Sequence, residues 1–187
     1  MIDKNITFIP INISLLTISD TRTMLDDKSG NILEDRIKKA GHNLVVRDLV
    51  RDDKNQITNL LKSWTVNKKT DVIISTGGTG LTGRDITPEA VESLYDKKID
   101  GFGEMFRIIS FKKIGTSALQ SRSTAGVING IYVFCLPGSP SACKDAWDEI
   151  LCYQLDIRHK PCNFVEIIPR LTENEIQSYA FHSISTR

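Results

Sequence analysis

The chain has 187 residues, of which 40% are hydrophobic and 25% are charged, a composition typical of one folded, water-soluble domain. Its 24 basic residues against 23 acidic residues leave a formal charge of +1, so the balance favours neither nucleic acid nor a membrane surface as the main partner. No apolar run approaches the roughly 18 residues that span a bilayer, and the N-terminus lacks the apolar stretch of a signal peptide. We therefore expect a cytoplasmic protein that binds no nucleic acid and no membrane.

The first half of the chain alternates strand-like and helix-like segments. An apolar strand is predicted over 11–18. A helix follows, which Ser29 caps and Gly41 ends, and then a second strand over 44–50. Asp53 begins the next helix, because a glutamine three residues later completes a capping box. The apolar positions of the two helices follow helical spacing: Ile32, Leu33, Ile37 and Ala40 in the first, and Ile57, Leu60, Leu61 and Trp64 in the second.

The second half begins with a strand over 72–75 and a helix that Thr87 caps, with proline at its first position. Another helix is predicted over 101–113, and an Asn-Gly pair predicts the turn of a β-hairpin over 125–135. Ser139 is placed to cap the last helix. We expect these last two helices to bury the following side chains: Phe102, Met105, Phe106 and Ile109, and then Cys143, Ala146, Trp147, Ile150 and Leu151.

This order predicts an α/β fold, a three-layer αβα sandwich with a mostly parallel central sheet and one β-hairpin. We place an N-terminal extension at 1–9, one domain at 10–168, and a C-terminal tail at 169–187 whose last dozen residues are expected to be flexible. Four apolar residues before the tail are available to pack on the body or on a neighbour: Phe164, Val165, Ile167 and Ile168.

The cysteines predict no metal site. They include no C-x-x-C pair and the histidines are scattered, whereas a zinc site needs tighter grouping. In a reducing compartment we expect them to be free thiols. They are Cys135, Cys143, Cys152 and Cys162.

The most informative segment is the glycine-rich stretch 71–89. A short apolar strand runs into four glycines within seven residues, and glycine lets the backbone approach an anion closely. Such a turn before a helix is a common phosphate cradle. The carboxylate beside it, Asp85, suits a phosphorylated ligand if a divalent cation lies between them, so the segment predicts a phosphate and Mg²⁺ site. The glycines are Gly77, Gly78, Gly80 and Gly83.

Other polar segments follow the ends of the remaining predicted strands. The first strand runs into 17–22, the second into 51–53, and the hairpin's second arm into 137–139. Ligands of an open parallel sheet bind at the carboxyl ends of its strands. We therefore expect Asp52 and Asp85 to border one cleft together with these loops.

Several of these residues have plainer interpretations. Asp52 is also explained as a solvated acid before the Asp53 cap, and Asp85 as an Asx-type turn that bonds backbone N–H groups near Thr87. Asp20 and Arg22 are equally consistent with a surface ion pair.

The polar stretch 117–122 is equally ambiguous. It offers the hydroxyl of Ser121 and the guanidinium of Arg122 to a phosphate, and on composition it is also a plain polar loop. Arg107 is read as a solvated charge.

Two common nucleotide motifs fit less well. The spacing Gly78-x-Gly80-x-x-Gly83 matches a dinucleotide pattern and leaves a nicotinamide-dependent oxidoreductase as an alternative, but it occurs in the third strand–helix unit. A P-loop is excluded because Arg84-Asp85 replaces the required Lys-Ser/Thr. A serine nucleophile has no histidine partner at any obvious position.

Taken together, the motifs resemble one family, that of the molybdopterin-binding domains of molybdenum cofactor biosynthesis. The resemblance covers about residues 8 to 168 and is specific, because the motifs recur in order. They are Ser19-Asp20, Thr76-Gly-Gly-Thr-Gly80, Arg84-Asp-Ile-Thr-Pro-Glu-Ala90, Gly101-Phe-Gly-Glu104 and Leu136-Pro-Gly-Ser-Pro140.

The resemblance implies a three-layer αβα domain that assembles as a homotrimer or homohexamer. Active members of the family bind molybdopterin and Mg-ATP, transfer AMP to the terminal phosphate of molybdopterin, and pass the product to a molybdate-insertion enzyme. The alternative that it leaves open is a molybdopterin-binding carrier or scaffold without catalysis.

The resemblance also implies roles for particular residues. Asp52 and Asp85 match the catalytic and Mg²⁺-binding aspartates of the active members. The residues expected to bind the substrates are Ser19, Asp20, Thr76, Gly77, Gly78, Thr79, Gly80, Ser121, Arg122, Pro137, Gly138 and Ser139.

Overall fold

The structure, a computed structural model, describes residues 1–173 and contains a six-stranded sheet in the order β2-β1-β3-β6-β5-β4. The first four strands in that order are parallel, whereas β5 and β4 pair antiparallel with their neighbours. The predicted mostly parallel sheet with one hairpin is therefore confirmed, and only the two-residue β4 is unforeseen. The strands are β1 (Asn12–Ile18), β2 (Asn43–Val50), β3 (Val72–Thr76), β4 (Lys97–Lys98), β5 (Thr124–Ile128) and β6 (Ile131–Leu136).

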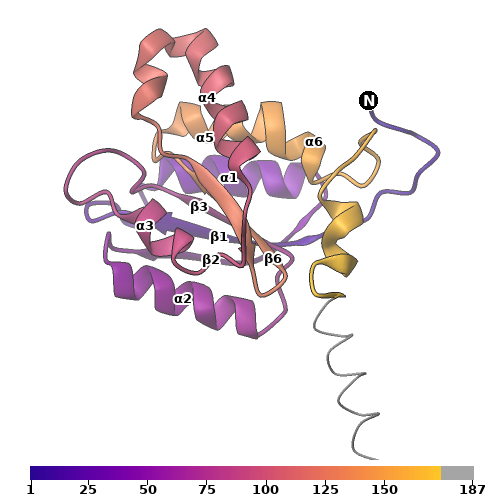
Figure 1. Ribbon diagram of the computed structural model, residues 1–187, viewed down its shortest axis with the longest axis horizontal. Helices are drawn as coiled ribbons and strands as arrows, with labels where there is room; N and C mark the ends of the chain where they lie inside the picture. Colours follow the sequence, from indigo (N-terminus) through magenta and orange to yellow (C-terminus); the bar gives the residue numbers. More distant parts are fainter. Residues whose placement is uncertain (174–187) are drawn as a thin grey trace, which may run out of the picture.

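Helices cover both faces of the sheet and complete three layers (Figure 1). On one face lie α1 (Lys28–Lys39), α4 (Asp100–Ile114) and α5 (Pro140–Ala146), and on the other lie α2 (Lys54–Val66) and α3 (Thr87–Glu92). Alternate side chains of each strand enter the two cores, as Phe134 and Val133 of β6 do. Burial on both faces explains why apolar residues fill β6 and most positions of β1 and β3.

Two helix starts are as predicted and two are not. Asp53 and Ser139 cap α2 and α5, each accepting a hydrogen bond from the backbone N–H three residues on. The cap of α1 is Asp27 rather than Ser29. Ser29 lies inside the helix, where its hydroxyl donates to the carbonyl of Gly138 at 2.7 Å. The correction arises because a distant loop offers the serine an acceptor, which sequence spacing does not show.

The next two helices also differ in detail from the prediction. Thr87 is the first residue of α3 and not its cap, and Ile86 before it makes no side-chain capping bond. On α4, Phe102 and Phe106 are buried as expected, but half of the Met105 surface is exposed. Met105 flanks the inward stripe of α4 instead of belonging to it.

The hairpin turn has the predicted chemistry. Asn129 and Gly130 have φ angles of 51° and 77°. A two-residue type I′ turn requires positive φ at both positions, which is why Asn-Gly is favoured there. The turn fixes the register in which β5 and β6 pair.

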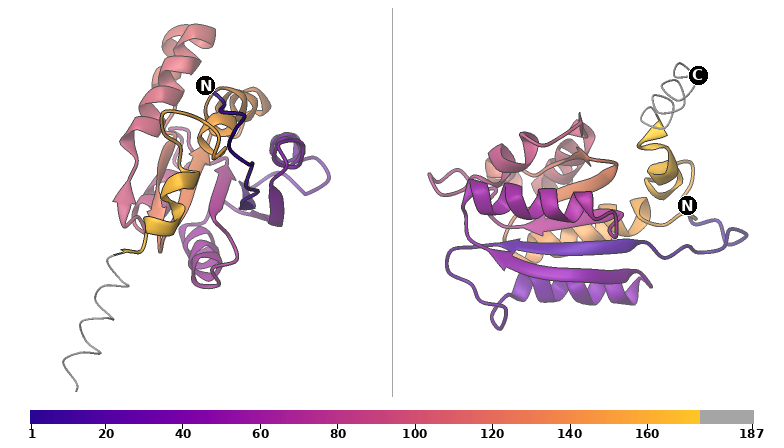
Figure 2. Two further views of the ribbon diagram at one scale, coloured as in Figure 1. Left: turned by 90° about the vertical axis from the view of Figure 1, so that its right-hand side faces the viewer. Right: turned by 90° about the horizontal axis from the view of Figure 1, so that it is seen from below.

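The N-terminal segment lies beside the segment that follows α6 (Cys152–Gln154) (Figure 2). The backbone N–H of Lys160 donates to the carbonyl of Met1 at 3.0 Å, which ties the N-terminal extension to the segment after α6. The 3₁₀-helix η3 (Val165–Arg170) and Leu171 lie against the core, so packing continues past the boundary expected at residue 168. Within that segment Val165 is buried and Ile167 is largely exposed. The flexibility expected of the last dozen residues concerns a part of the chain outside the described residues.

The cysteines are free thiols, as expected. Cys135 and Cys143 are buried, and burial raises the pKa of each thiol to about 11. Among residues 1–173, no helix combines the length and the hydrophobicity that crossing a membrane requires.

Candidate functional site

The carboxyl ends of the parallel strands converge on one cavity of about 220 Å³, which we call the acidic cavity. The loops after β1, β2, β3 and β6 all contribute to its walls. Asp52 and Asp85 line it together with the backbone of Gly77, Gly78 and Gly138. The structure thus brings the two aspartates and the glycine turn together, as the strand-end argument predicts, while their chemical roles stay predictions.

The glycine turn is shaped so that only glycine fits at its first two positions. Gly77 has a φ of 109°, and a Cβ there would lie 2.0 Å from the carbonyl oxygen of Ile18. Gly78 has a φ of 62°, and its Cβ would lie 2.5 Å from Oδ1 of Asp52 and 2.2 Å from Oγ1 of Thr87. The missing side chains therefore leave bare backbone facing the acidic cavity.

Asp52 is held in an unfavourable place for a carboxylate. Its Oδ1 is buried and has no hydrogen-bond partner among the described residues. Burial raises the pKa of Asp52, and the nearby carboxylates of Asp20 and Asp85 raise it further. A buried oxygen without a partner beside two like charges is an arrangement that a bound cation would stabilise.

Asp85 has the opposite environment. Its Oδ2 accepts hydrogen bonds from the backbone N–H of Thr82 at 2.8 Å and from the Thr82 hydroxyl at 2.6 Å. Although burial alone would raise the pKa of Asp85, these bonds and the charge of Arg122 hold it below its usual value. The Asx-type turn considered for Asp85 was expected to bond backbone near Thr87, but the carboxylate bonds back to Thr82 instead, through one of its oxygens.

Two arginines balance part of this negative charge. Arg84 lies 3.9 Å from Asp20, so the ion pair considered between Asp20 and Arg22 is replaced by this one. Arg22 lines the acidic cavity and donates to the carbonyl of Gly138 at 2.8 Å. The sequence placed the loop 17–22 at the cleft but gave Arg22 no binding role there. The position of this arginine directly after the first strand was the only signal.

A second cavity of about 350 Å³ adjoins the first, and we call it the mixed cavity. The two share Gly78, Asp85 and Gly138. Phe106 and Ile114 of α4 give the mixed cavity an apolar wall. Its polar wall comes from predicted residues: Thr79, Gly80, Ser121, Pro137 and Ser139.

Some predicted residues lie elsewhere or are already engaged. Thr76 is fully buried, and its hydroxyl donates to the carbonyl of Pro137 at 2.8 Å. Ser19 lines the acidic cavity, but its hydroxyl accepts a bond from the backbone N–H of Arg22 at 3.2 Å. Arg122 lines neither cavity. The structure therefore makes Thr76 a support beneath the turn.

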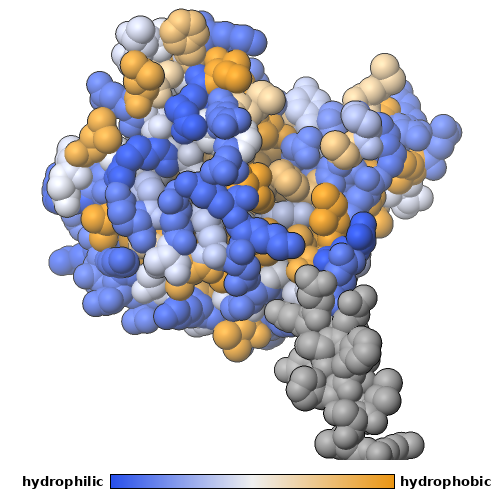
Figure 3. Space-filling view, viewed as in Figure 1, coloured by the Kyte–Doolittle hydropathy of each residue, from blue (hydrophilic) through white to orange (hydrophobic). Residues whose placement is uncertain are grey.

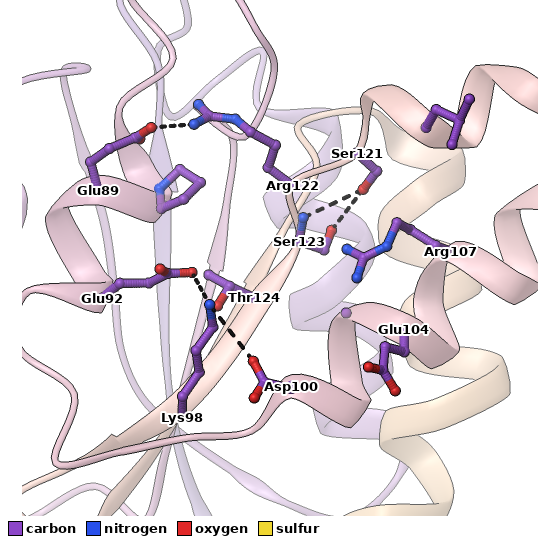
Figure 4. Close-up of a pocket in the computed structure, with 13 residues that line it drawn as sticks. Glu89, Glu92, Lys98, Asp100, Glu104, Arg107, Ser121, Arg122, Ser123 and Thr124 are labelled. Carbon is purple, nitrogen blue, oxygen red and sulfur yellow. Dashed lines mark hydrogen bonds and ion pairs between the residues drawn. The ribbon is translucent and has the colours of Figure 1, made fainter.

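A larger cavity, of about 660 Å³, opens on the far side of Arg122 between α3, β4 and α4 (Figure 4). Most of its charges pair with one another, as Lys98 does with Glu92 and Asp100. The side chain of Arg107 points into it and makes no hydrogen bond or ion pair with residues 1–173. Neither Asp52, Asp85 nor the glycine turn lines this cavity, so we do not take it as the candidate functional site although it is larger.

The acid pair suits a cation that a ligand helps to hold. Residues 1–173 contain no group of three or more His, Cys, Asp or Glu side chains arranged to bind a metal. Mg²⁺ is commonly bound by one or two carboxylates together with substrate phosphates and water. Asp52 and Asp85 beside a glycine cradle fit that donor set.

Comparison with known proteins finds one family. Residues 14–157 match the family described as "Probable molybdopterin binding domain". The chain is similar to Molybdenum cofactor biosynthesis protein B of Escherichia coli, with 46% identity over 157 residues, covering 84% of this chain and 92% of that protein.

Solved structures agree with this match. A crystal structure of Molybdenum cofactor biosynthesis protein B superposes with a TM-score of 0.79 and 39% identity, covering 88% of this chain and 97% of the other. The tungsten cofactor synthesizing protein MoaB from Pyrococcus furiosus superposes with a TM-score of 0.68 and 35% identity, covering 76% and 91%.

Proposed function

This chain belongs to the molybdopterin-binding domain family, and from that premise we propose that it acts in molybdenum cofactor biosynthesis by transferring AMP from Mg-ATP to the terminal phosphate of molybdopterin. Molybdopterin and ATP are the substrates and Mg²⁺ is the cofactor. The observation that supports this most is that Asp52, Asp85 and the Gly77–Gly80 turn meet at one cavity.

The two adjoining cavities suit two ligands that meet end to end. The mixed cavity has an apolar wall and hydroxyl-bearing loops, which suit a ring system carrying polar groups. The acidic cavity has the glycine backbone and Arg22, which suit phosphates. Gly78 and Gly138 lie at the boundary, where the reacting phosphates would meet.

Joining two phosphorylated molecules is opposed by their like charge. In this proposal the backbone N–H groups that follow Gly77 cradle phosphate oxygens, and Arg22 adds a positive charge. Asp52 and Asp85 would hold Mg²⁺ or its waters, and the charge of the ion would offset the repulsion between the phosphates. The residues position an in-line attack of the molybdopterin phosphate on the α-phosphorus of ATP, and pyrophosphate leaves. No covalent enzyme intermediate is required.

The test is a product assay with purified protein, molybdopterin, ATP and Mg²⁺. We expect adenylylated molybdopterin and pyrophosphate in equal amounts. Asp85→Asn should remove most turnover while molybdopterin still binds, because the substitution changes ion binding and leaves the glycine cradle intact. Bound molybdopterin without any product in the wild-type protein would support a non-catalytic carrier or scaffold instead.

We also propose that the chain forms a homo-oligomer, a trimer or a hexamer, through α4 and the 3₁₀-helix η1 (Gly115–Gln120). Five large apolar side chains of this region are at least half exposed, and Figure 3 shows hydrophobic residues gathered at the top of the view over α4. Apolar patches of this kind mark protein interfaces. The five residues are Met105, Ile108, Phe111, Ile114 and Leu119.

A molybdate-insertion enzyme is the partner proposed to take the product.

A further inference from the structure

The side chain of Arg122 bonds to the loop that carries Asp85 and to the helix that follows it. Its Nε donates to the carbonyl of Gly80 at 2.8 Å, and its Nη2 donates to the carbonyl of Asp85 at 2.7 Å. Its Nη1 pairs with Glu89 on α3. Its own backbone N–H donates to the carbonyl of Thr79 at 3.3 Å. One side chain thus grips the loop at both of its ends.

The loop between these contacts is also held by the bonds between Asp85 and Thr82 and by Arg84, which lies 3.9 Å from Asp20. Residues 81–84 are exposed and form neither helix nor strand. A guanidinium presents a rigid fork of donors that can reach two carbonyls at once, whereas a lysine ammonium is a point charge on a flexible stem. The spacing of the carbonyls of Gly80 and Asp85 is therefore set by the shape of Arg122 as much as by its charge.

We propose that Arg122 is a positioning residue: it fixes the 80–85 loop so that the Asp85 carboxylate faces the acidic cavity, and it does not bind substrate phosphate. This replaces the role expected for Arg122 from the sequence. We call this set of Arg122 contacts the clamp. Its geometry follows from the contacts described above, whereas its effect on turnover rests on the proposed function.

The first experiment measures the loop directly, without substrates. Hydrogen exchange of a peptide covering 79–86 is compared in the wild-type protein, Arg122→Gln and Arg122→Lys, with Arg107→Gln as the matched control because Arg107 makes no described bond. We expect exchange in this peptide to accelerate about tenfold in both Arg122 variants, since each loses carbonyl bonds that close the loop. Arg107→Gln should exchange like the wild type. Wild-type exchange in Arg122→Lys would overturn the clamp, because charge alone would then suffice.

Thermal unfolding, and hydrogen exchange of peptides elsewhere in the sheet, show whether Arg122→Lys loosens the 80–85 loop alone or destabilises the whole protein. The proposal requires that peptides from β1 and β3 keep wild-type protection in Arg122→Lys. Acceleration spread evenly over the molecule would count against a local clamp.

The second experiment asks what the clamp does for the reaction. In the AMP-transfer assay we expect kcat of Arg122→Lys to fall by about tenfold or more, because small misplacements of a catalytic group are costly. KM for molybdopterin should stay within about twofold of the wild-type value. Only the loss of a contact between Arg122 and the substrate phosphate would raise it further. A raised KM with unchanged kcat would make Arg122 a substrate ligand and defeat the proposal. A wild-type protein without turnover would defeat the proposed function alone, because the exchange experiment still decides the clamp.

Discussion

At the scale of single residues, the two aspartates of the acidic cavity differ in how far they are satisfied. Asp85 accepts two hydrogen bonds from Thr82, which hold its pKa low. Asp52 has a buried oxygen without a described partner, and its pKa is raised by burial and by Asp20 and Asp85. The fold therefore keeps Asp52 in a place that costs stability unless a cation joins it. Such strain is common where function and stability conflict.

The first prediction concerns Asp52→Asn. A carboxyl group whose folded pKa is raised costs stability at pH values above its unfolded pKa, so at pH 7 the neutral amide should raise Tm. The same change removes a charge from the proposed Mg²⁺ site, and we expect turnover to fall by about 100-fold. Tm by calorimetry and the product assay provide the two measurements. Asp53→Asn is the control, since asparagine also caps helices well. A lower Tm in Asp52→Asn would contradict this account of the site.

The second prediction tests the glycine cradle by comparing Gly78→Val with Gly83→Val. A side chain at Gly78 meets Asp52 and Thr87 and must adopt positive φ, whereas a Cβ at Gly83 meets nothing within 4 Å. We expect Gly78→Val to abolish detectable binding of ATP, and Gly83→Val to bind like the wild type. Isothermal calorimetry measures both, with circular dichroism to show that each variant is folded. Equal affinity in the two variants would argue against phosphate at the turn.

At the scale of elements, one buried carboxylate ties together the elements on which the site stands. Asp27 caps α1, accepts from the Thr17 hydroxyl of β1 at 2.6 Å, and pairs with Arg47 of β2 at 2.9 Å. Asp27 is fully buried and Arg47 nearly so. Arg22 of the acidic cavity also lies 3.9 Å from Asp27. The loop after β1 is therefore anchored to the first three elements of the fold.

The third prediction is that Asp27→Asn destabilises the fold in a pH-dependent way. The change removes the charged acceptor of one Arg47 bond, while Glu34 stays as a second carboxylate partner at 2.6 Å, so it should cost about 2 kcal/mol at pH 7, measured by urea unfolding. Burial alone would raise the pKa of Asp27, but its bonds to Thr17, to the α1 backbone and to Arg47 bring it below 3.8. The stabilisation is therefore full above about pH 4 and is lost as pH falls through the lower folded pKa, so the difference between wild type and variant should shrink toward pH 2.

The control for this prediction is Asp35→Asn on the same helix. Asp35 is exposed and pairs with Lys39 at the helix surface, so its loss should change stability by no more than about 0.5 kcal/mol. A pH-independent difference between the wild type and Asp27→Asn would mean that the carboxylate's charge contributes nothing.

At the scale of the whole molecule, α4 contributes both to the mixed cavity and to the exposed apolar surface of the protein. One side of the helix supplies Phe106 and Ile114 to the mixed cavity, and another side exposes Ile108 and Phe111. A surface that covers the exposed side in an oligomer would also steady the apolar wall of the cavity. Assembly and substrate binding are in this way expected to depend on the same helix.

The fourth prediction follows from that arrangement. Phe111→Glu places a charge in the exposed patch and should convert a trimer or hexamer to a monomer, as measured by light scattering during size-exclusion chromatography. Val66→Glu is the matched control, because Val66 is also an exposed apolar residue but ends α2 on the opposite face of the sheet. An unchanged mass for Phe111→Glu, or an equal loss in both variants, would remove α4 from the interface.

The sequence by itself determined the alternation of strands and helices, the hairpin, and which loops follow strand ends. These features depend on periodicity, glycine and capping chemistry within a few residues, so local pattern suffices. The sequence misplaced the starts of α1 and α3. For α1 the reason is that the hydroxyl of Ser29 donates to the carbonyl of Gly138, which is far away in the chain.

Only the tertiary structure decided what the side chains do once the strand ends meet. It placed Arg22 in the acidic cavity, put Thr76 beneath the turn, and bound Arg122 to the loop of Asp85. Each of these outcomes depends on partners more than 30 residues away in the chain, as Arg122 does on Asp85. Sequence patterns record which residues are near one another along the chain, whereas hydrogen bonds and charges act through space.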